Sequence, residues 1–131
     1  MKTDLIAKFQ FLASHSLAGY EIPHAHLWRL EITLSGEPKN GKIIDLIAFR
    51  ENVQELIAPL ESQYLNNCSA VTTQVREFPT CETLSVFFHE KIRHLTVHSF
   101  SLENPSIYLQ STLIAICAID GTETGAVRIS C

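Results

Sequence analysis

Hydrophobic and polar residues alternate with a period of two through the first quarter of the chain. In residues 5–15, the odd positions are apolar up to Ala13 and end on His15, while most even positions from Lys8 onward are polar. Successive side chains of a strand point to opposite faces, so this pattern predicts a strand with one apolar face. The same alternation in residues 24–34 predicts a second strand, which pairs with the first as a hairpin with a long loop.

The spacing of apolar residues becomes helical after a turn-rich loop at residues 35–41. An amphipathic helix packed on the sheet is predicted, and Pro59 should end or kink it near its last turn. A second helix should begin with Thr80 as its N-cap, with Glu82 in its first turn, and continue to Leu95. The apolar positions of the first helix are Leu46, Phe49, Val53, Leu56, Ile57 and Leu60.

The remaining segments complete a prediction of fold class. Residues 61–73 are polar and predict a loop with a short helical or extended piece. Residues 95–103 alternate and predict a strand, and residues 107–119 predict one or two more, with Gly121 and Gly125 breaking the final segment. The predicted order is β-β-α-α-β-β, an α+β fold with a four-stranded antiparallel sheet and two helices on one face. The 131 residues are expected to form one domain, 1–131.

Composition excludes several classes of protein. A hydrophobic content of 46% with 18% charged residues is typical of a globular chain. The net charge of −4 and the lack of a basic patch argue against a nucleic-acid partner. The longest apolar run, residues 113–119, is too short to span a membrane, and no signal peptide is recognised, so a cytoplasmic location is expected. The four cysteines lack C-x-x-C spacing and are expected to be free thiols.

Candidate chemistry lies where the two N-terminal strands meet. His24 and His26 are two residues apart on a predicted strand, so they project from the same face. They would supply two ligands of a three-histidine zinc site, although an isolated pair of this kind is more often structural. Antiparallel pairing brings His15 to the same end of the sheet, and three convergent histidines favour a metal.

With other short motifs, these histidines resemble the 6-pyruvoyl-tetrahydropterin synthase and 6-carboxy-tetrahydropterin synthase family, which has the tunnelling fold (T-fold). The resemblance covers the chain up to Tyr108, and residues 111–131 extend beyond it. The matching pieces are Phe11-Leu12-Ala13-Ser14-His15, His24-Ala25-His26, Gly41-Lys42-Ile43-Ile44-Asp45, Tyr64-Leu65-Asn66, Pro79-Thr80-Cys81-Glu82, Glu103 and Tyr108.

The resemblance implies a metal site and an assembly. His15, His24 and His26 would bind Zn²⁺ and leave one position open for substrate or water. Family members are hexamers of two stacked trimers with sites between subunits, so a homohexamer is expected. Such an assembly would cover the edges of a small sheet.

The resemblance also implies a pterin as the small-molecule partner. Glu103 would anchor the pterin, because one carboxylate can accept hydrogen bonds from a ring N–H and the adjacent amino group. Thr80 and Glu82 lie where the family builds its pterin pocket. Without the family, Glu103 is a solvated strand-end charge, and Thr80 and Glu82 are helix-capping residues.

The sequence departs from the family at the residues that move protons. Tyr20 stands where the family has a catalytic cysteine, and Ala25 replaces the glycine of His-Gly-His. The family's Asp-His pair before Tyr-Leu-Asn reads Glu61-Ser62 here, so the carboxylate remains as Glu61 and the histidine is lost.

One departure resembles a variant subgroup of the family. Glu21 stands three residues before His24, and the subgroup has Glu-x-x-His-Gly-His in place of the cysteine motif. That subgroup cleaves the side chain of dihydroneopterin triphosphate to 6-hydroxymethyl-dihydropterin. A carboxylate beside zinc can act as the base, and the alternative is that Glu21 is a loop charge.

Three hypotheses of function follow. The first is a zinc-dependent lyase acting on 7,8-dihydroneopterin triphosphate or a related pterin, with Glu21 and Glu61 as catalytic candidates and a pyruvoyl, carboxy or hydroxymethyl product. The second is a homologue that binds zinc and pterin but has lost the proton relay. The third is another T-fold reaction on a different substrate.

Overall fold

Two long strands form the base of the sheet. The structure, a computed structural model, describes residues 1–17 and 22–130. Strands β1 (Thr3–His15) and β2 (His24–Gly36) pair antiparallel over their whole length, from Thr3 opposite Gly36 to His15 opposite His24. This confirms the two N-terminal strands and places the histidines at one end of the sheet.

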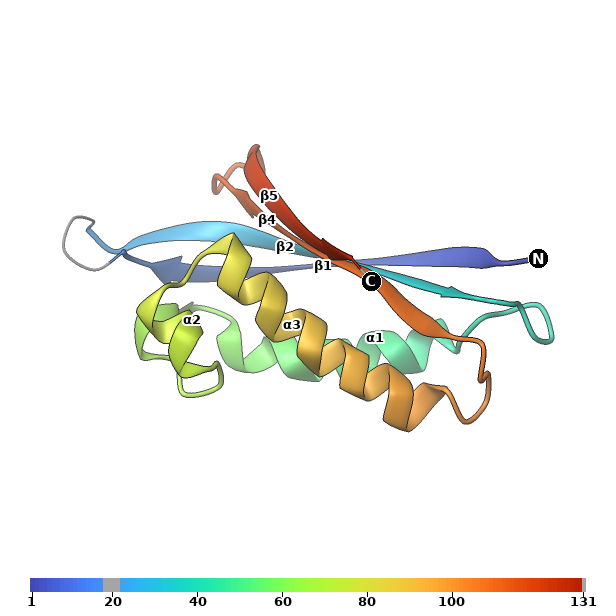
Figure 1. The fold of residues 1–131 in the computed structure, drawn as a ribbon. Helices are drawn as coiled ribbons and strands as arrows, with labels where there is room; N and C mark the ends of the chain where they lie inside the picture. The colour runs from blue at the N-terminus through green and yellow to red at the C-terminus, as the bar shows by residue number, and fades with distance from the viewer. Residues whose placement is uncertain (18–21, 131) are drawn as a thin grey trace.

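Within the described residues, the sheet has five strands in the order β3-β1-β2-β4-β5 (Figure 1). The additional strands are β3 (Gln63–Tyr64), β4 (Tyr108–Cys117) and β5 (Glu123–Ser130). β3 runs parallel to β1 and the other pairs are antiparallel. The predicted α+β class is therefore confirmed, but the prediction of four antiparallel strands was wrong.

The helices lie on one face of the sheet, as predicted, but there are three α-helices among the described residues instead of two (Figure 1). Asp45 caps the first helix by accepting hydrogen bonds from the backbone N–H groups of Ile47 and Ala48. The helices are α1 (Leu46–Ile57), η1 (Ala58–Leu60), η2 (Leu65–Asn67), α2 (Thr73–Glu77), α3 (Cys81–Leu95) and η3 (Thr96–Phe100).

The strand predicted for residues 95–103 is wrong, because helical backbone continues through this segment. The Ser101 N–H donates to the Thr96 carbonyl at 3.0 Å, which is the i→i+5 bond of a π-helical turn. Thr96 and Phe100 are buried, and their spacing of four puts both on the helical face that meets the core. An alternating pattern over so few residues is compatible with a strand or a helix, and the burial of Thr96 and Phe100 in the core favours the helix.

The last strand was also missed. Gly121 has a φ of +93° and lies in the turn before β5, so it interrupts the chain there as predicted. Gly125 lies within β5, opposite Ile116 and beside an irregularity in the β4–β5 register. Gly125 therefore coincides with the irregularity in register, and it does not end the strand as we had predicted.

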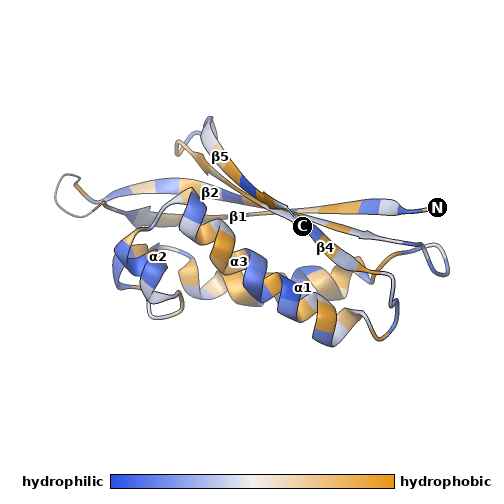
Figure 2. Cartoon of the chain, in the orientation of Figure 1, coloured by the Kyte–Doolittle hydropathy of each residue, from blue (hydrophilic) through white to orange (hydrophobic). Residues whose placement is uncertain are grey.

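The core lies between the sheet and the helices. Figure 2 shows hydrophobic and hydrophilic residues mixed along α1 and α3, which is typical of amphipathic helices. The Phe11 ring lies 6.4 Å from Trp28 on the sheet and 6.0 Å from Phe88 of α3. Burying each such side chain stabilises the fold by roughly 1.5–3 kcal/mol. Within the described residues, no helix is both long and apolar enough to cross a membrane.

Candidate metal centre

Three histidines converge at the end of the β1–β2 pair. Each of His15, His24 and His26 offers a ring nitrogen, and the three nitrogens lie within 4.8 Å of one another. His15 is buried, His26 is half-buried and His24 is exposed. One side of the cluster therefore faces the protein interior and the other faces solvent.

The far nitrogen of each ring is held by a main-chain carbonyl. The distances are 2.6 Å from His15 Nδ1 to the Pro79 oxygen, 2.8 Å from His24 Nδ1 to the Ile22 oxygen and 3.2 Å from His26 Nδ1 to the Cys117 oxygen. A carbonyl only accepts hydrogen bonds, so each Nδ1 carries the proton. Each Nε2 then carries the ring's lone pair, which is the usual tautomer of a metal-binding histidine.

Two of the Nε2 atoms have the spacing that a shared metal ion requires. His15 Nε2 and His24 Nε2 lie 3.1 Å apart. Two nitrogens bound tetrahedrally to one zinc ion, with bonds of about 2.0–2.1 Å, would be about 3.3 Å apart. Two unprotonated nitrogens facing each other this closely repel unless a cation or a proton lies between them. The donor set therefore fits a divalent metal that favours imidazole, such as zinc.

Trp28 forms the inner wall of the cluster. It is fully buried, its ring makes edge contacts with His15 and His26 at centroid distances of 5.1 and 6.0 Å, and its Nε1 donates to the Ala13 carbonyl at 3.1 Å. The inner side of the cluster therefore faces an apolar ring.

The Tyr64-Leu65-Asn66 motif holds the backbone directly after His15. The Asn66 side chain accepts from the Ser16 N–H at 3.0 Å and donates to the Ser16 carbonyl at 2.8 Å. The Tyr64 and Ser16 hydroxyls lie 2.5 Å apart. This part of the motif therefore has a positioning role for the first histidine.

Thr80 and Glu82 lie at the start of α3, next to the carbonyl that holds His15. The Thr80 hydroxyl accepts from the Thr83 N–H at 3.2 Å, and the Thr83 hydroxyl accepts from the Thr80 N–H at 3.2 Å. This capping box confirms the predicted helix start. Glu82 is exposed in the first turn. Both residues follow closely after the Pro79 carbonyl that contacts His15, and their role in a substrate pocket stays a prediction.

Two cysteines near the cluster were not expected from the sequence. Cys117 supplies the carbonyl that holds His26, and Cys81 follows Pro79 by two residues. Burial, with smaller contributions from the nearby Glu82 and Cys117, raises the pKa of the Cys81 thiol to about 11. Cys81 is therefore a neutral thiol at physiological pH and is a poor base.

Glu61 lies at the outer edge of β1. Its carboxylate accepts from the Leu12 N–H at 3.3 Å, and the N–H of the adjacent Ser62 donates to the Leu12 carbonyl at 2.6 Å. Leu12 is three residues before His15 on this strand. The observed contacts give Glu61 a role in covering the sheet edge.

Glu103 lies at the opposite end of the sheet from the histidines of its own chain. Its carbonyl accepts from Lys39 Nζ at 3.2 Å, and the adjacent Asn104 side chain donates to the Glu37 carbonyl just beyond β2. A strand of 13 residues is about 40 Å long. The two groups could share one ligand only if Glu103 came from a second copy of the chain.

Tyr20 and Glu21, the two departures next to the histidine pair, lie outside the described residues.

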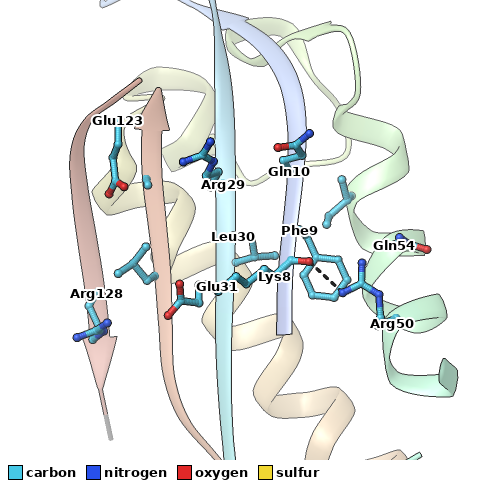
Figure 3. Close-up of a pocket in the computed structure, with 13 residues that line it drawn as sticks. Lys8, Phe9, Gln10, Arg29, Leu30, Glu31, Arg50, Gln54, Glu123 and Arg128 are labelled. Carbon is cyan, nitrogen blue, oxygen red and sulfur yellow. Dashed lines mark hydrogen bonds between the residues drawn. The ribbon is translucent and has the colours of Figure 1, made fainter. Parts of the chain in front are cut away.

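A hollow in the surface of the protein lies away from the histidine cluster. It measures about 640 Å³, and Figure 3 shows charged side chains from three strands of the sheet around it, with Arg50 of α1 donating to the Lys8 carbonyl at 2.9 Å. None of the three histidines lines it. Its charged lining residues are Lys8, Arg29, Glu31, Arg50, Glu123 and Arg128.

Comparisons with known proteins agree on one family. The chain is 27% identical over 95 residues to a dihydroneopterin monophosphate aldolase from Pyrococcus furiosus, covering 71% of this chain and 77% of that protein. The structure of 6-pyruvoyl tetrahydropterin synthase from Caenorhabditis elegans matches with a TM-score of 0.73 and 16% identity, over 100% of this chain and 96% of that one. A Plasmodium vivax 6-pyruvoyltetrahydropterin synthase, in a variant with its catalytic glutamate replaced by alanine, matches with a TM-score of 0.68 and 12% identity, over 100% and 99% of the two chains.

The family model of 6-pyruvoyl tetrahydropterin synthase matches residues 4–117, which include every strand and helix described except β5. This confirms the family and the T-fold. The chain therefore belongs to the 6-pyruvoyl tetrahydropterin synthase family.

Proposed function

We propose that this protein is a zinc-dependent lyase that cleaves the side chain of a phosphorylated dihydropterin. The observation that carries the proposal is the histidine cluster, in which three backbone carbonyls bind the Nδ1 protons and the three rings converge closely enough to share one metal ion. His15, His24 and His26 would hold the zinc, with a fourth position open. When bound, zinc supplies a Lewis acid that makes nearby hydroxyl and C–H groups of a substrate more acidic.

Two relatives support the choice of reaction. The Pyrococcus furiosus protein is a dihydroneopterin monophosphate aldolase, and an aldolase breaks a carbon–carbon bond. The Plasmodium vivax enzyme has a catalytic glutamate. Glu21 stands three residues before His24 and is our candidate for the corresponding base.

The proposed reaction is a reverse aldol cleavage. Glu21 takes the proton from the second hydroxyl of the substrate's side chain, the bond between the first and second side-chain carbons breaks, and the phosphorylated fragment leaves as an aldehyde. The carbon left on the pterin takes up a proton, which gives 6-hydroxymethyl-dihydropterin. No oxidant or water is consumed, so the chemistry needs only a base, an acid and the metal.

Recognition of the pterin would involve two copies of the chain. Thr80 and Glu82, which follow the Pro79 carbonyl that contacts His15, would bind the pterin, and the carboxylate of Glu103 would reach the ring from a neighbouring copy in a hexamer. Glu61 would act indirectly, because its carboxylate binds the backbone of β1 close to His15.

The test begins with the metal. Wild type should contain about one zinc ion per chain and the His24→Ala variant much less. Purified protein incubated with dihydroneopterin monophosphate and triphosphate should yield 6-hydroxymethyl-dihydropterin, identified by mass. Glu21→Gln should abolish the product and keep the zinc, while the exposed helix residue Glu55, changed to Gln as a control, should leave both unchanged. A pyruvoyl or carboxy product, or full activity in Glu21→Gln, would refute the proposed reaction.

A second candidate function is a homologue that binds zinc and a pterin without turnover. The absence of the family's cysteine and histidine at Tyr20 and Ser62 favours it, because the raised pKa of Cys81 prevents that thiol from replacing the cysteine as a base. Tight pterin binding with no product from either phosphate ester would select this candidate.

A further inference from the structure

We infer that the end of α3 and the π-helical turn after it carry a second binding site for a divalent transition-metal ion, formed by His94 and His98. The two residues are four apart on continuous helical backbone. Both side chains are exposed, and their ring centroids lie 4.1 Å apart with the planes inclined at 39°. Two imidazoles that already lie this close need only small side-chain rotations to share one ion.

No other described residue holds these two rings in place. Neither imidazole forms a hydrogen bond or an ion pair to a described residue, in contrast to His89 earlier on the helix, whose Nδ1 is bonded to the Thr112 hydroxyl at 3.0 Å. The neighbouring Arg93 guanidinium is held by Glu90 at 3.0 Å. That ion pair offsets the positive charge of Arg93, which would otherwise repel a metal cation.

The backbone between the two histidines supports the inference independently. Thr96–Phe100 forms a single π-helical turn, closed by the bond from the Ser101 N–H to the Thr96 carbonyl. Such turns are rare and frequently occur at functional sites. Here the turn sets the angle at which His98 projects relative to His94.

The ligand type defines the class of ion. Imidazole favours copper, nickel and zinc, and the affinity of a nitrogen site is highest for Cu²⁺. Two histidines leave the remaining positions to water, so the site would be weaker than the buried three-histidine cluster. It also lies apart from that cluster, because His94 is about 20 Å along the helix axis from the α3 end that contacts His15.

The test counts the metal bound by purified, untagged protein after equilibrium dialysis against micromolar Cu²⁺ and Zn²⁺. Wild type should hold two ions per chain. His94→Ala and His98→Ala should each hold one, with the affinity for the lost ion reduced on the order of tenfold or more, because a single imidazole loses the advantage of a second ligand at high local concentration. Binding of Cu²⁺ to both rings should also give nitrogen hyperfine coupling from two equivalent ligands in the electron paramagnetic resonance spectrum.

Two further variants distinguish binding by this pair of rings from binding by a single exposed histidine and from binding by the three-histidine cluster. In His98→Ala combined with Ser101→His, the number of histidines is unchanged but the rings are two helical turns apart, about 10 Å, so the second ion should still be lost. In His24→Ala, the three-histidine cluster is broken but the helix site should keep its ion. Retention of two ions in both single variants, or in the relocated double variant, would overturn the inference.

Discussion

The histidines of the candidate metal centre are held by main-chain carbonyls of Ile22, Pro79 and Cys117. A substitution at one of these three positions keeps the carbonyl. The orientation of the rings therefore depends on the backbone path and is protected from many single mutations.

We predict that neither of the two thiols near the metal centre is a metal ligand. Cys81→Ala and Cys117→Ala should each retain one zinc ion per chain, because the Cys117 carbonyl and not its thiol contacts His26, and Cys81 has a pKa of about 11. His26→Ala should lose the metal. Elemental analysis of the three variants is the measurement, and loss of zinc in Cys117→Ala alone would show that a thiolate is a ligand.

At the scale of secondary-structure elements, the N-terminal cap of α3 lies next to the metal centre. Its cap residue, Thr80, directly follows the carbonyl that binds His15. Thr80→Ala should lower the free energy of unfolding by about 1 kcal/mol through loss of the cap. It should also weaken zinc binding, because the Pro79 carbonyl would no longer be fixed.

The control for this prediction is Thr80→Ser, which keeps the capping hydroxyl. Urea unfolding of metal-free protein and a competition assay with a zinc chelator measure the two effects separately. A loss of stability with unchanged zinc affinity would show that the cap does not position the carbonyl.

The elements also show how far the sequence could predict the fold. Strands β1 and β2, helix α1 and the start of α3 were predictable because their periodicity is long and their caps are standard. Residues 96–100 were not, since an alternating pattern of five residues also fits a helix whose buried positions are four apart. The short strand β3 has two residues and no periodicity to detect.

Some parts of the candidate site could likewise be predicted from the sequence, and others could not. Three histidines in register could be inferred from strand pairing alone. Their carbonyl partners could not, because Pro79 and Cys117 are distant in sequence and carbonyls have no sequence signature. For Glu103, the motif did not reveal that the residue lies at the opposite end of the sheet from the histidines of its own chain.

At the scale of the whole molecule, the described sheet has exposed backbone edges along β5 and along the part of β1 that the two-residue strand β3 does not cover, and a charged hollow lies on its surface. Among the described residues, Lys8, Arg29, Glu31 and Arg128 form no ion pair with another side chain. Open edges and unpaired charges are both features that a second copy of the chain can complete.

We therefore expect the protein to be a hexamer in solution. Light scattering should give a mass six times the 14.7 kDa of one chain. Pterin binding should be lost when the assembly is dissociated by dilution, because Glu103 would then be out of reach of the histidines. A monomer that still binds pterin would contradict both the assembly and the assignment of Glu103.

The carbonyl partners of the histidines have a consequence for synthesis of the chain. The three histidines precede the Pro79 and Cys117 oxygens by more than 50 residues in the chain, so these oxygens are synthesised well after the histidines. Until then, the imidazoles of His15 and His26 lack these partners and can rotate and exchange tautomers. Tight metal loading should accordingly be a late event in the life of a new molecule, and a bound ion would mark a chain that has finished folding.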